Sequence, residues 1–283
     1  MILDGKIVAA SIKQQLKEEI EAAVVNGRRK PKLVIITVGD DPASKVYVRN
    51  KIKAAEEVGI EVFHVTFDKS NKKNVYDVIN TIQYYNDDDK VDGIMVQLPL
   101  PEGWDERAII DTIAPSKDVD GLTTTNIGRL RSGQKCLKPC TAQGVIDLCK
   151  YYNIELEGKD ITIIGRSNIV GKPLADMMMA EGATVAQCHS HTKSLDKHTL
   201  NSDIIISAIG KPKLITEDML PCGAVVIDVG INRDINGKLC GDVDYENAWV
   251  VCGSITPVPG GVGPMTVAEL MKNVIEAWRR NII

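Results

Sequence analysis

Short runs of apolar, mostly β-branched residues recur along the chain and constrain its fold more than any other feature. The clearest of them lack polar alternation, which is typical of strands buried on both faces of a parallel sheet. Segments with apolar residues at helical spacing follow several of these runs, so the pattern predicts an α/β protein. The expected strands are LVIITVG (33–39), EVFHVTF (61–67), GIMVQLP (93–99), DITIIG (160–165), TVAQC (184–188), DIIISAIG (203–210), AVVIDVG (224–230) and WVVCGSIT (249–256).

The intervening segments predict helices. Residues 6–25 carry apolar residues at helical spacing, and a helix over 43–58 would end at Gly59, a favourable C-cap. The motif TVAE has the threonine and glutamate of a capping box, so the last helix is expected to begin at Thr266 and to run to about residue 281. Further helices are expected over 74–86, 105–113 and 140–152.

Two strand–helix series meet near the turn APSKDVDG (114–121). The chain has 283 residues, enough for two ordinary domains. We therefore expect two three-layer α/β domains with parallel sheets, over residues 1–119 and 120–283.

Bulk properties exclude several classes of protein. A formal net charge of -4 without a long basic run argues against a nucleic-acid partner. No apolar run reaches membrane-spanning length, and the N-terminus resembles neither a signal nor a transit peptide, so we expect a cytoplasmic protein. The seven cysteines are scattered, and the CHSH segment (188–191) has no carboxylate or second thiol nearby in sequence. We expect no metal site.

The segment DITIIGRSNIVGKPLADMM (160–178) predicts a strand, a glycine turn and a helix, the context of a dinucleotide site. Gly165 and Gly171 are one residue further apart than the outer glycines of GxGxxG, and Ser167 replaces the middle glycine. An ordinary strand–helix turn therefore remains an alternative on these residues alone.

The end of the next strand favours NADP over NAD. TVAQCHSHT (184–192) lacks the acid that usually accepts from the ribose 2′-hydroxyl, but it offers Ser190, and Arg166 stands in the first turn. A guanidinium and a hydroxyl suit a 2′-phosphate. Ile231 follows another strand end, where open α/β sheets bind ligands, and completes the expected cofactor-binding set.

Polar residues at other strand ends indicate a substrate site. Tyr47 and Lys51 are four residues apart, on one face of an expected helix. Gln97 ends a strand, and Asp120 lies in the turn between the two series. The loop PVPGGVGPMT (257–266) would let its backbone approach a planar ligand closely. A solvated surface lysine and a tight connecting loop are the simpler alternatives for Lys51 and for the glycines.

Together these motifs resemble the bifunctional methylenetetrahydrofolate dehydrogenase/methenyltetrahydrofolate cyclohydrolase family over essentially the whole chain. The resemblance is carried by DDPASKVYVRNK, VDGIMVQLPLP, KDVDG, GRSNIVGKPLA, CGDVDYE and TPVPGGVGPMTVAEL. It implies two α/β domains with a cleft between them, the second Rossmann-like and NADP-binding. It also implies a last helix that returns to the first domain, a homodimer, and a place in one-carbon metabolism and purine biosynthesis.

The resemblance also assigns a reaction. Hydride would pass from 5,10-methylenetetrahydrofolate to NADP without a metal, and water would then open the methenyl cation to 10-formyltetrahydrofolate. The second step moves protons and needs a group that can carry them. By resemblance the catalytic set is Lys51, Tyr47, Gln97 and Asp120, in which Gln97 orients the lysine amine. The substrate-binding set is Ser44, Tyr47 and Asp120 around the pterin, with Pro259, Gly260 and Gly261 along the aminobenzoate portion.

Two stretches depart from the family pattern. Thr123–Thr125 replace an aromatic-His-Pro run, which could alter the folate pocket, and Ala142 replaces a proline that would only preorganise a helix start. A dehydrogenase without cyclohydrolase activity, another two-domain NADP dehydrogenase of the shikimate type, and a non-catalytic NADP-sensing or scaffold protein are the alternatives. The last predicts loss of Lys51, Gln97 and Asp120, and all three are present.

Overall fold

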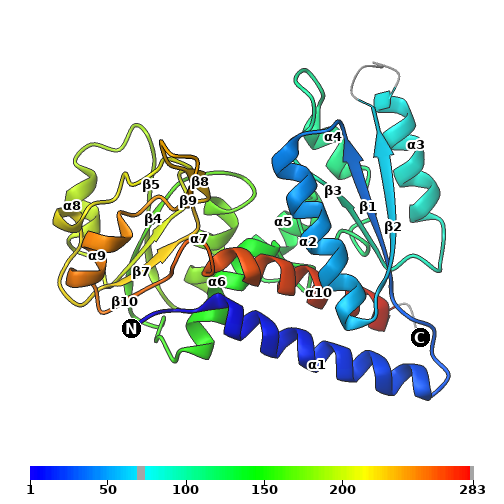
Figure 1. Cartoon of the computed structure of the whole chain (residues 1–283), viewed down its shortest axis with the longest axis horizontal. Helices are drawn as coiled ribbons and strands as arrows, with labels where there is room; N and C mark the ends of the chain where they lie inside the picture. Colours follow the sequence, from blue (N-terminus) through cyan, green and yellow to red (C-terminus); the bar gives the residue numbers. More distant parts are fainter. Residues whose placement is uncertain (69–73, 281–283) are drawn as a thin grey trace. The chain divides into compact units, whose positions relative to one another are not determined.

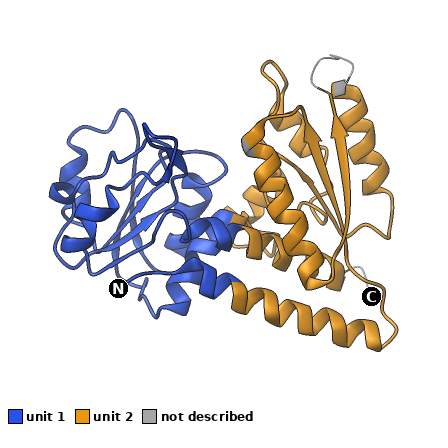
Figure 2. Ribbon diagram, viewed as in Figure 1, with its two compact units in different colours: residues 1–9, 141–266 blue, residues 10–140, 267–283 orange. Residues whose placement is uncertain are grey.

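The computed structural model describes residues 1–68 and 74–280, and it divides the chain into two compact units (Figure 2). Unit 1 comprises Met1–Ala9 and Thr141–Thr266, and unit 2 comprises Ala10–Cys140 and Val267–Ile283. These units differ from the ranges expected from the sequence, because packing rather than order along the chain decides which unit a segment joins. The chain passes from one unit to the other three times, each time inside a helix. These helices are α1 (Gly5–Val25), α6 (Cys140–Tyr151) and α10 (Val262–Arg280).

Unit 2 contains a three-stranded parallel sheet in the order β2-β1-β3. The central strand is β1 (Lys32–Val38), with β2 (Glu61–Phe67) and β3 (Gly93–Val96) on either side (Figure 1). In this register Leu33 is paired with Val62 of one neighbour and Gly93 of the other. Because β1 is central, both of its faces are buried, which explains its unbroken apolar sequence.

Helices cover both faces of this sheet and give the unit three layers. Leu33 and Ile35 belong to a core cluster with side chains of α1, α2 (Pro42–Val58) and α10. Val34 and Ile36 alternate with them and belong to a second cluster, with side chains of α3 (Asn74–Asn86) and α4 (Glu106–Asp111). The remaining helix of the unit's described residues is α5 (Thr124–Arg131).

Unit 1 contains a five-stranded parallel sheet in the order β10-β7-β6-β4-β5. Its strands are β4 (Asp160–Ile164), β5 (Thr184–Cys188), β6 (Ile204–Ser207), β7 (Val225–Asp228) and β10 (Ser254–Ile255). Counted along the chain, this is the doubly wound order 2-1-3-4-5, whose switch point lies between β4 and β6. The remaining elements are α7 (Gly171–Ala180), α8 (Leu195–Thr199), the short helix η1 (Glu217–Met219), α9 (Tyr245–Val251), and the hairpin β8 (Asn232–Arg233) and β9 (Leu239–Cys240).

The predicted fold class, α/β with parallel sheets and a Rossmann-like second half, is confirmed. Two element predictions were wrong. The strand expected over 249–256 is the end of α9 followed by the two-residue strand β10. The last helix begins at Val262 rather than at Thr266, so the apparent capping box lies inside it. Pro264 then sits in the first turn, where a missing N–H costs nothing.

No helix among residues 1–68 and 74–280 is long and apolar enough to cross a membrane. Nor does any group of three or more histidine, cysteine, aspartate or glutamate side chains within these ranges have the arrangement needed to hold a metal ion.

Candidate active site

The centre of the candidate site is a hydrogen bond between Lys51 and Gln97. Lys51 lies on α2 and is only 8% exposed. Its Nζ donates to Oε1 of Gln97 at 3.1 Å. Gln97 follows β3; its backbone N–H donates to Ile36 O at 2.8 Å, and its Nε2 donates to Leu98 O at 2.7 Å. The backbone bond fixes the position of Gln97, and the side-chain amide is held with its oxygen toward the lysine.

Ser44 and Tyr47 lie on the same face of α2 as Lys51. The helix begins after Asp41, whose side chain caps it by accepting from the Ser44 N–H at 2.7 Å. Ser44 is buried, whereas Tyr47 is 36% exposed. Partial burial raises the pKa of the Tyr47 phenol above its usual value, so the hydroxyl stays protonated and can donate a hydrogen bond at neutral pH.

Asp120 lies in a turn that a neighbouring carboxylate holds closed. Asp118 is 1% exposed and accepts from the backbone N–H groups of Leu122 at 3.1 Å and Thr123 at 2.8 Å. Burial raises the pKa of Asp118 in spite of these bonds. Gly121 adopts φ +72°, and any side chain there would overlap the backbone at Lys138. Asp118 therefore has a structural role in this turn, whereas Asp120 is half-buried.

The buried thiol of Cys140 lies near both Lys51 and Asp120, a position that no sequence pattern indicated. Burial raises its pKa well above the usual value; the Asp120 carboxylate raises it further, and the Lys51 ammonium lowers it. The thiol donates to Val119 O at 3.2 Å. Asn273 of α10 donates to the same carbonyl at 2.8 Å. The four predicted catalytic residues thus all lie in unit 2, with Lys51, Gln97 and Asp120 in one neighbourhood.

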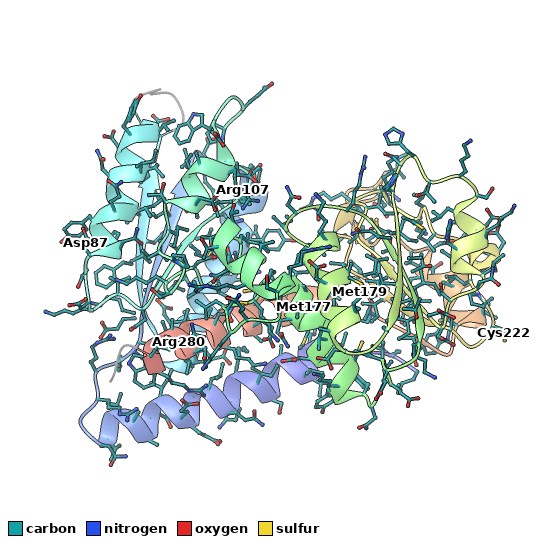
Figure 3. The ribbon with its side chains drawn as sticks, turned by 180° about the vertical axis from the view of Figure 1, so that it is seen from behind. Asp87, Arg107, Met177, Met179, Cys222 and Arg280 are labelled. Atoms are coloured by element: carbon teal, nitrogen blue, oxygen red, sulfur yellow. The ribbon has the colours of Figure 1, made fainter. Side chains whose placement is uncertain are left out.

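The threonine-rich departure is firmly anchored beside this turn. Thr123 caps α5 by accepting from the Asn126 N–H at 3.3 Å. Asn126 in turn donates to Asp118 at 2.9 Å. Thr124 donates to Asp111 through both its N–H, at 2.6 Å, and its hydroxyl, at 2.7 Å. Arg107 of α4, labelled in Figure 3, donates to Leu122 O at 2.6 Å. The altered sequence therefore forms a capped helix start instead of a loose loop.

In unit 1, the glycine turn after β4 lies at the switch point of the sheet. Gly165 adopts φ +130°, and a side chain there would overlap the carbonyl of Ala208, which follows β6. A side chain at Gly171 would overlap the carbonyl of Gly165. Ser167 Oγ accepts from the N–H groups of Val170 at 3.1 Å and Gly171 at 3.3 Å, and so holds the turn closed just before α7.

The residues at this turn fit a phosphorylated dinucleotide. Arg166 is exposed and has no hydrogen-bond or ion-pair partner within residues 1–68 and 74–280. Ser190 is exposed in the turn after β5, which is closed by a bond from the His189 N–H to Thr192 Oγ1 at 2.9 Å. The two glycines allow close backbone approach to a pyrophosphate, while Arg166 and Ser190 can bind a 2′-phosphate.

Two buried aspartates, not singled out in the sequence, order the loops beside Ile231. Asp242 is 0% exposed and joins the turn after β6 to the turn after β7. It accepts from the Ile209 N–H at 2.7 Å, the Lys211 N–H at 2.9 Å and Asn232 Nδ2 at 2.8 Å. Ile231 itself is 45% exposed. The motif CGDVDYE was the available signal, because Asp242 is its first acid.

Asp228, at the end of β7, is the second of these aspartates. It is 3% exposed and accepts from the N–H groups of Gly230 at 2.9 Å, Asp242 at 3.0 Å and Val243 at 2.8 Å. Burial, reinforced by the nearby Asp242 carboxylate, raises its pKa to about 7. Side chains at Gly230 and Gly241 would overlap these carboxylates, so both glycines are required by packing.

The glycine-rich loop of unit 1 packs against the start of the chain. The Gly5 N–H donates to Gly260 O at 2.9 Å, and the Gly261 N–H donates to Pro257 O at 2.7 Å. Gly260 and Gly261 are buried, whereas Pro259 is exposed. Of the three residues expected to contact the aminobenzoate group, Pro259 is thus the one that presents free surface.

Both halves of the chain match family models. Residues 3–120 match the catalytic domain of tetrahydrofolate dehydrogenase/cyclohydrolase, and residues 139–282 match its NAD(P)-binding domain. A protein called bifunctional protein FolD from Mycoplasma capricolum is 50% identical over 100% of this chain and 99% of its own length.

Solved structures show the same similarity as the family models. The FolD methylenetetrahydrofolate dehydrogenase/cyclohydrolase of Campylobacter jejuni has a TM-score of 0.96 at 45% identity, covering 100% of this chain and 99% of that one. The Trypanosoma brucei enzyme, solved with NADP cofactor and an inhibitor, has a TM-score of 0.93 at 36% identity and covers 100% and 98%. Shikimate dehydrogenase of Thermus thermophilus is only 14% identical with a TM-score of 0.53, which shows a shared fold alone. This chain belongs to the tetrahydrofolate dehydrogenase/cyclohydrolase family.

Proposed function

We propose that Lys51, Tyr47, Gln97 and Asp120 of unit 2 carry the chemistry of both folate reactions. The protein is an NADP-dependent bifunctional enzyme: it oxidises 5,10-methylenetetrahydrofolate to the methenyl form and hydrolyses that form to 10-formyltetrahydrofolate. The observation that supports the assignment of residues is the Lys51–Gln97 hydrogen bond, because it holds a buried amine at a carboxyl strand end.

In the oxidation, the side chains of this site mainly position the substrate. Asp120 accepts from the pterin amine and amide, and Tyr47 stacks on the pterin, with Ser44 at the start of the same helix. Bound NADP supplies the hydride acceptor. Arg166 and Ser190 would hold its 2′-phosphate, the turn Gly165–Ser167 would bind its pyrophosphate, and Ile231 would contact it. Pre-orientation of donor and acceptor supplies most of the rate, because the folate nitrogens themselves stabilise the methenyl cation.

In the hydrolysis, water adds to the methenyl carbon, and the bond from that carbon to one nitrogen of the five-membered ring breaks. One proton of the water moves to the released nitrogen, and the other leaves to solvent, which removes the positive charge of the cation. Lys51 Nζ is the group that carries the proton to the nitrogen. Gln97 Oε1 accepts one Nζ hydrogen and thereby aims the rest of the amine toward the substrate. A lysine with rotational freedom would be aligned only part of the time, so Gln97 is proposed to act through Lys51.

The experiment that tests this assignment compares wild type with Lys51→Met. Reduction of NADP and of NAD is followed with 5,10-methylenetetrahydrofolate, and the hydrolysis of preformed methenyltetrahydrofolate is measured separately. Hydrolysis is expected to be lost in Lys51→Met. Lys53→Met is the matched control, since Lys53 is an exposed lysine of the same helix. If Lys51→Met hydrolyses methenyltetrahydrofolate as fast as this control, Lys51 has no role in the hydrolysis.

We further propose a homodimer formed through β2. This strand lies at the edge of the three-stranded sheet, so one row of its backbone hydrogen-bonding groups is available to another chain. Phe63 on this strand is 45% exposed. Light scattering on wild type and Phe63→Lys tests the proposal: the variant should be monomeric, and an unchanged mass would contradict the use of this edge.

The remaining proposals concern cellular context. A net charge of -4 supports a protein without a nucleic-acid partner, and we place the enzyme in the cytoplasm. Its product carries a formyl group of the kind consumed in purine biosynthesis. A second candidate, dehydrogenase activity without cyclohydrolase activity, predicts wild-type NADP reduction with no acceleration of methenyl hydrolysis, and the same assays distinguish the two.

A further inference from the structure

Lys6 stands where the physics of helices disfavours a lysine. It is the second residue of the 21-residue helix α1, whose N-terminal end carries a partial positive charge. No acidic residue lies in the first turn of this helix. Asp4, just before it, caps the helix by accepting from the backbone N–H groups of Lys6 at 2.8 Å and Ile7 at 3.4 Å. Residues that break a local rule without structural compensation often serve function.

The side chain of Lys6 lies over the glycine-rich loop. A Cβ placed on Gly260 would be 3.1 Å from Lys6 Cε and 3.6 Å from Lys6 Nζ. The backbone on both sides of Lys6 is fixed, because Gly5 donates to Gly260 O at 2.9 Å and Asp4 accepts from the Lys6 N–H. A ligand lying on this loop would therefore meet Lys6 as well as exposed Pro259.

Lys6 also has an available charge. The side chain is exposed and makes no ion pair within residues 1–68 and 74–280. Its aliphatic stem covers Gly260 while its ammonium group stays in water. The two local sources of positive potential, the ammonium and the helix N-terminus, act in the same direction, and the capping Asp4 offsets them only in part.

We propose that Lys6 binds the glutamate carboxylates of the folate substrate and so provides a subsite for the folate tail. The inference rests on the proposed function and on the placement, expected from the family resemblance, of Pro259, Gly260 and Gly261 along the aminobenzoate portion of the substrate. The glutamate is joined to that portion by an amide, so its carboxylates emerge next to the loop. Each additional γ-linked glutamate adds one carboxylate, so the subsite favours substrates with longer tails.

The test compares three substrates: 5,10-methylenetetrahydrofolate with one glutamate, the same compound with three, and the tetrahydropteroate analogue with none. Lys6→Ala should raise KM for both glutamate-bearing substrates by about fivefold, the upper range for an exposed ion pair. It should leave kcat, KM for NADP and KM for the pteroate analogue unchanged. The effect should disappear in high salt, which screens exposed charges.

Two further variants make the result specific. Lys6→Arg keeps the charge and should retain wild-type KM values. Lys17→Ala removes an exposed lysine of the same helix, away from the loop, and should change nothing. The proposal is overturned if Lys6→Ala has wild-type KM for the triglutamate substrate. It is also overturned if KM rises equally for the pteroate analogue, since Lys6 would then act through packing. Wild-type protein that reduces no NADP with any of the three folate substrates would instead overturn the proposed function, a result visible before any variant is made.

Discussion

Replacing Gln97 by alanine removes the acceptor of the Lys51 hydrogen bond while leaving the lysine in place. Lys51 is 8% exposed, and Gln97 Oε1 is its one hydrogen-bond partner within the described part of the chain. The backbone of Gln97 is held independently by its bond to Ile36 O. The substitution should therefore disturb the orientation of the amine and leave the strand end intact.

The expected loss of hydrolysis rate can be worked out from the kind of hydrogen bond that Lys51 and Gln97 form. A hydrogen bond with a charged partner contributes roughly 1.5–3 kcal/mol. If that contribution is made in the transition state of hydrolysis, its loss lowers kcat by about 10- to 150-fold, since each 1.36 kcal/mol is tenfold. Hydride transfer needs no proton carrier, so the dehydrogenase kcat should fall by much less. The expected signature is thus a change in the ratio of the two activities.

The assay follows both steps in the same preparations of wild type, Gln97→Ala and Gln97→Glu. Glutamate at position 97 would keep the contact but pair the ammonium with a carboxylate, which holds the proton on Lys51 and should also impair hydrolysis. Gln83→Ala is the control, since Gln83 is exposed on α3. If Gln97→Ala hydrolyses the methenyl compound within twofold of wild type, the proposed role of the Lys51–Gln97 bond is wrong.

Three further predictions concern unit 1. Arg166→Ala should raise KM for NADP by about 10- to 100-fold and leave KM for NAD nearly unchanged, measured by steady-state kinetics with both cofactors. Gly171→Ala forces a methyl group against Gly165 O and should lower the free energy of unfolding by roughly 1–3 kcal/mol, with weaker NADP binding in calorimetry. Asp228 has a folded-state pKa raised to about 7, above its ordinary value of 3.8, so the native state holds a proton that the unfolded state releases. Its contribution to stability should therefore be fully present below pH 3.8 and be lost as pH rises from there to about 7, by about 1.4 kcal/mol per pH unit between these two values. Denaturant unfolding of wild type and Asp228→Asn between pH 5 and 8 measures it, and equal slopes in the two proteins would contradict the prediction.

Much of the fold could be predicted because burial determines the local pattern of apolar residues along the sequence. The run LVIITVG is apolar without alternation, and the structure shows why: Leu33 and Ile35 face one helical layer while Val34 and Ile36 face the other. The rule that ligands bind at the carboxyl ends of parallel strands also anticipated where Gln97 and Gly165 lie.

The wrong predictions share a different physical cause. WVV (249–251) has strand-forming residues, yet it ends α9, because β propensity reflects the packing environment more than the backbone. The TVAE sequence has the chemistry of a capping box, but the preceding residues Val262–Met265 already have helical geometry. Local signals of this kind are overridden when tertiary contacts favour another start.

The hydrogen bonds that hold the turn of Asp120 could not be predicted from any local sequence pattern. Asn273 donates to Val119 O and to Lys138 O, both at 2.8 Å, and so joins the last helix to the turn that carries Asp120. These partners are separated in sequence by more than a hundred residues. The residues of α10 that pack beside β1, Leu270, Met271, Val274 and Trp278, are at most 1% exposed.

This packing has a consequence for how the enzyme is divided. The family model for the NAD(P)-binding domain includes α10, since it covers residues 139–282, but the side chains of α10 from Val267 onward belong to unit 2. A fragment that ends near residue 120 would leave the Leu33–Ile35 face of β1 without its α10 layer, and it would leave Val119 O without the Asn273 donor. The sequence boundary near residue 119 therefore marks the limit of the catalytic motifs. The catalytic unit itself is completed only by the last helix of the chain.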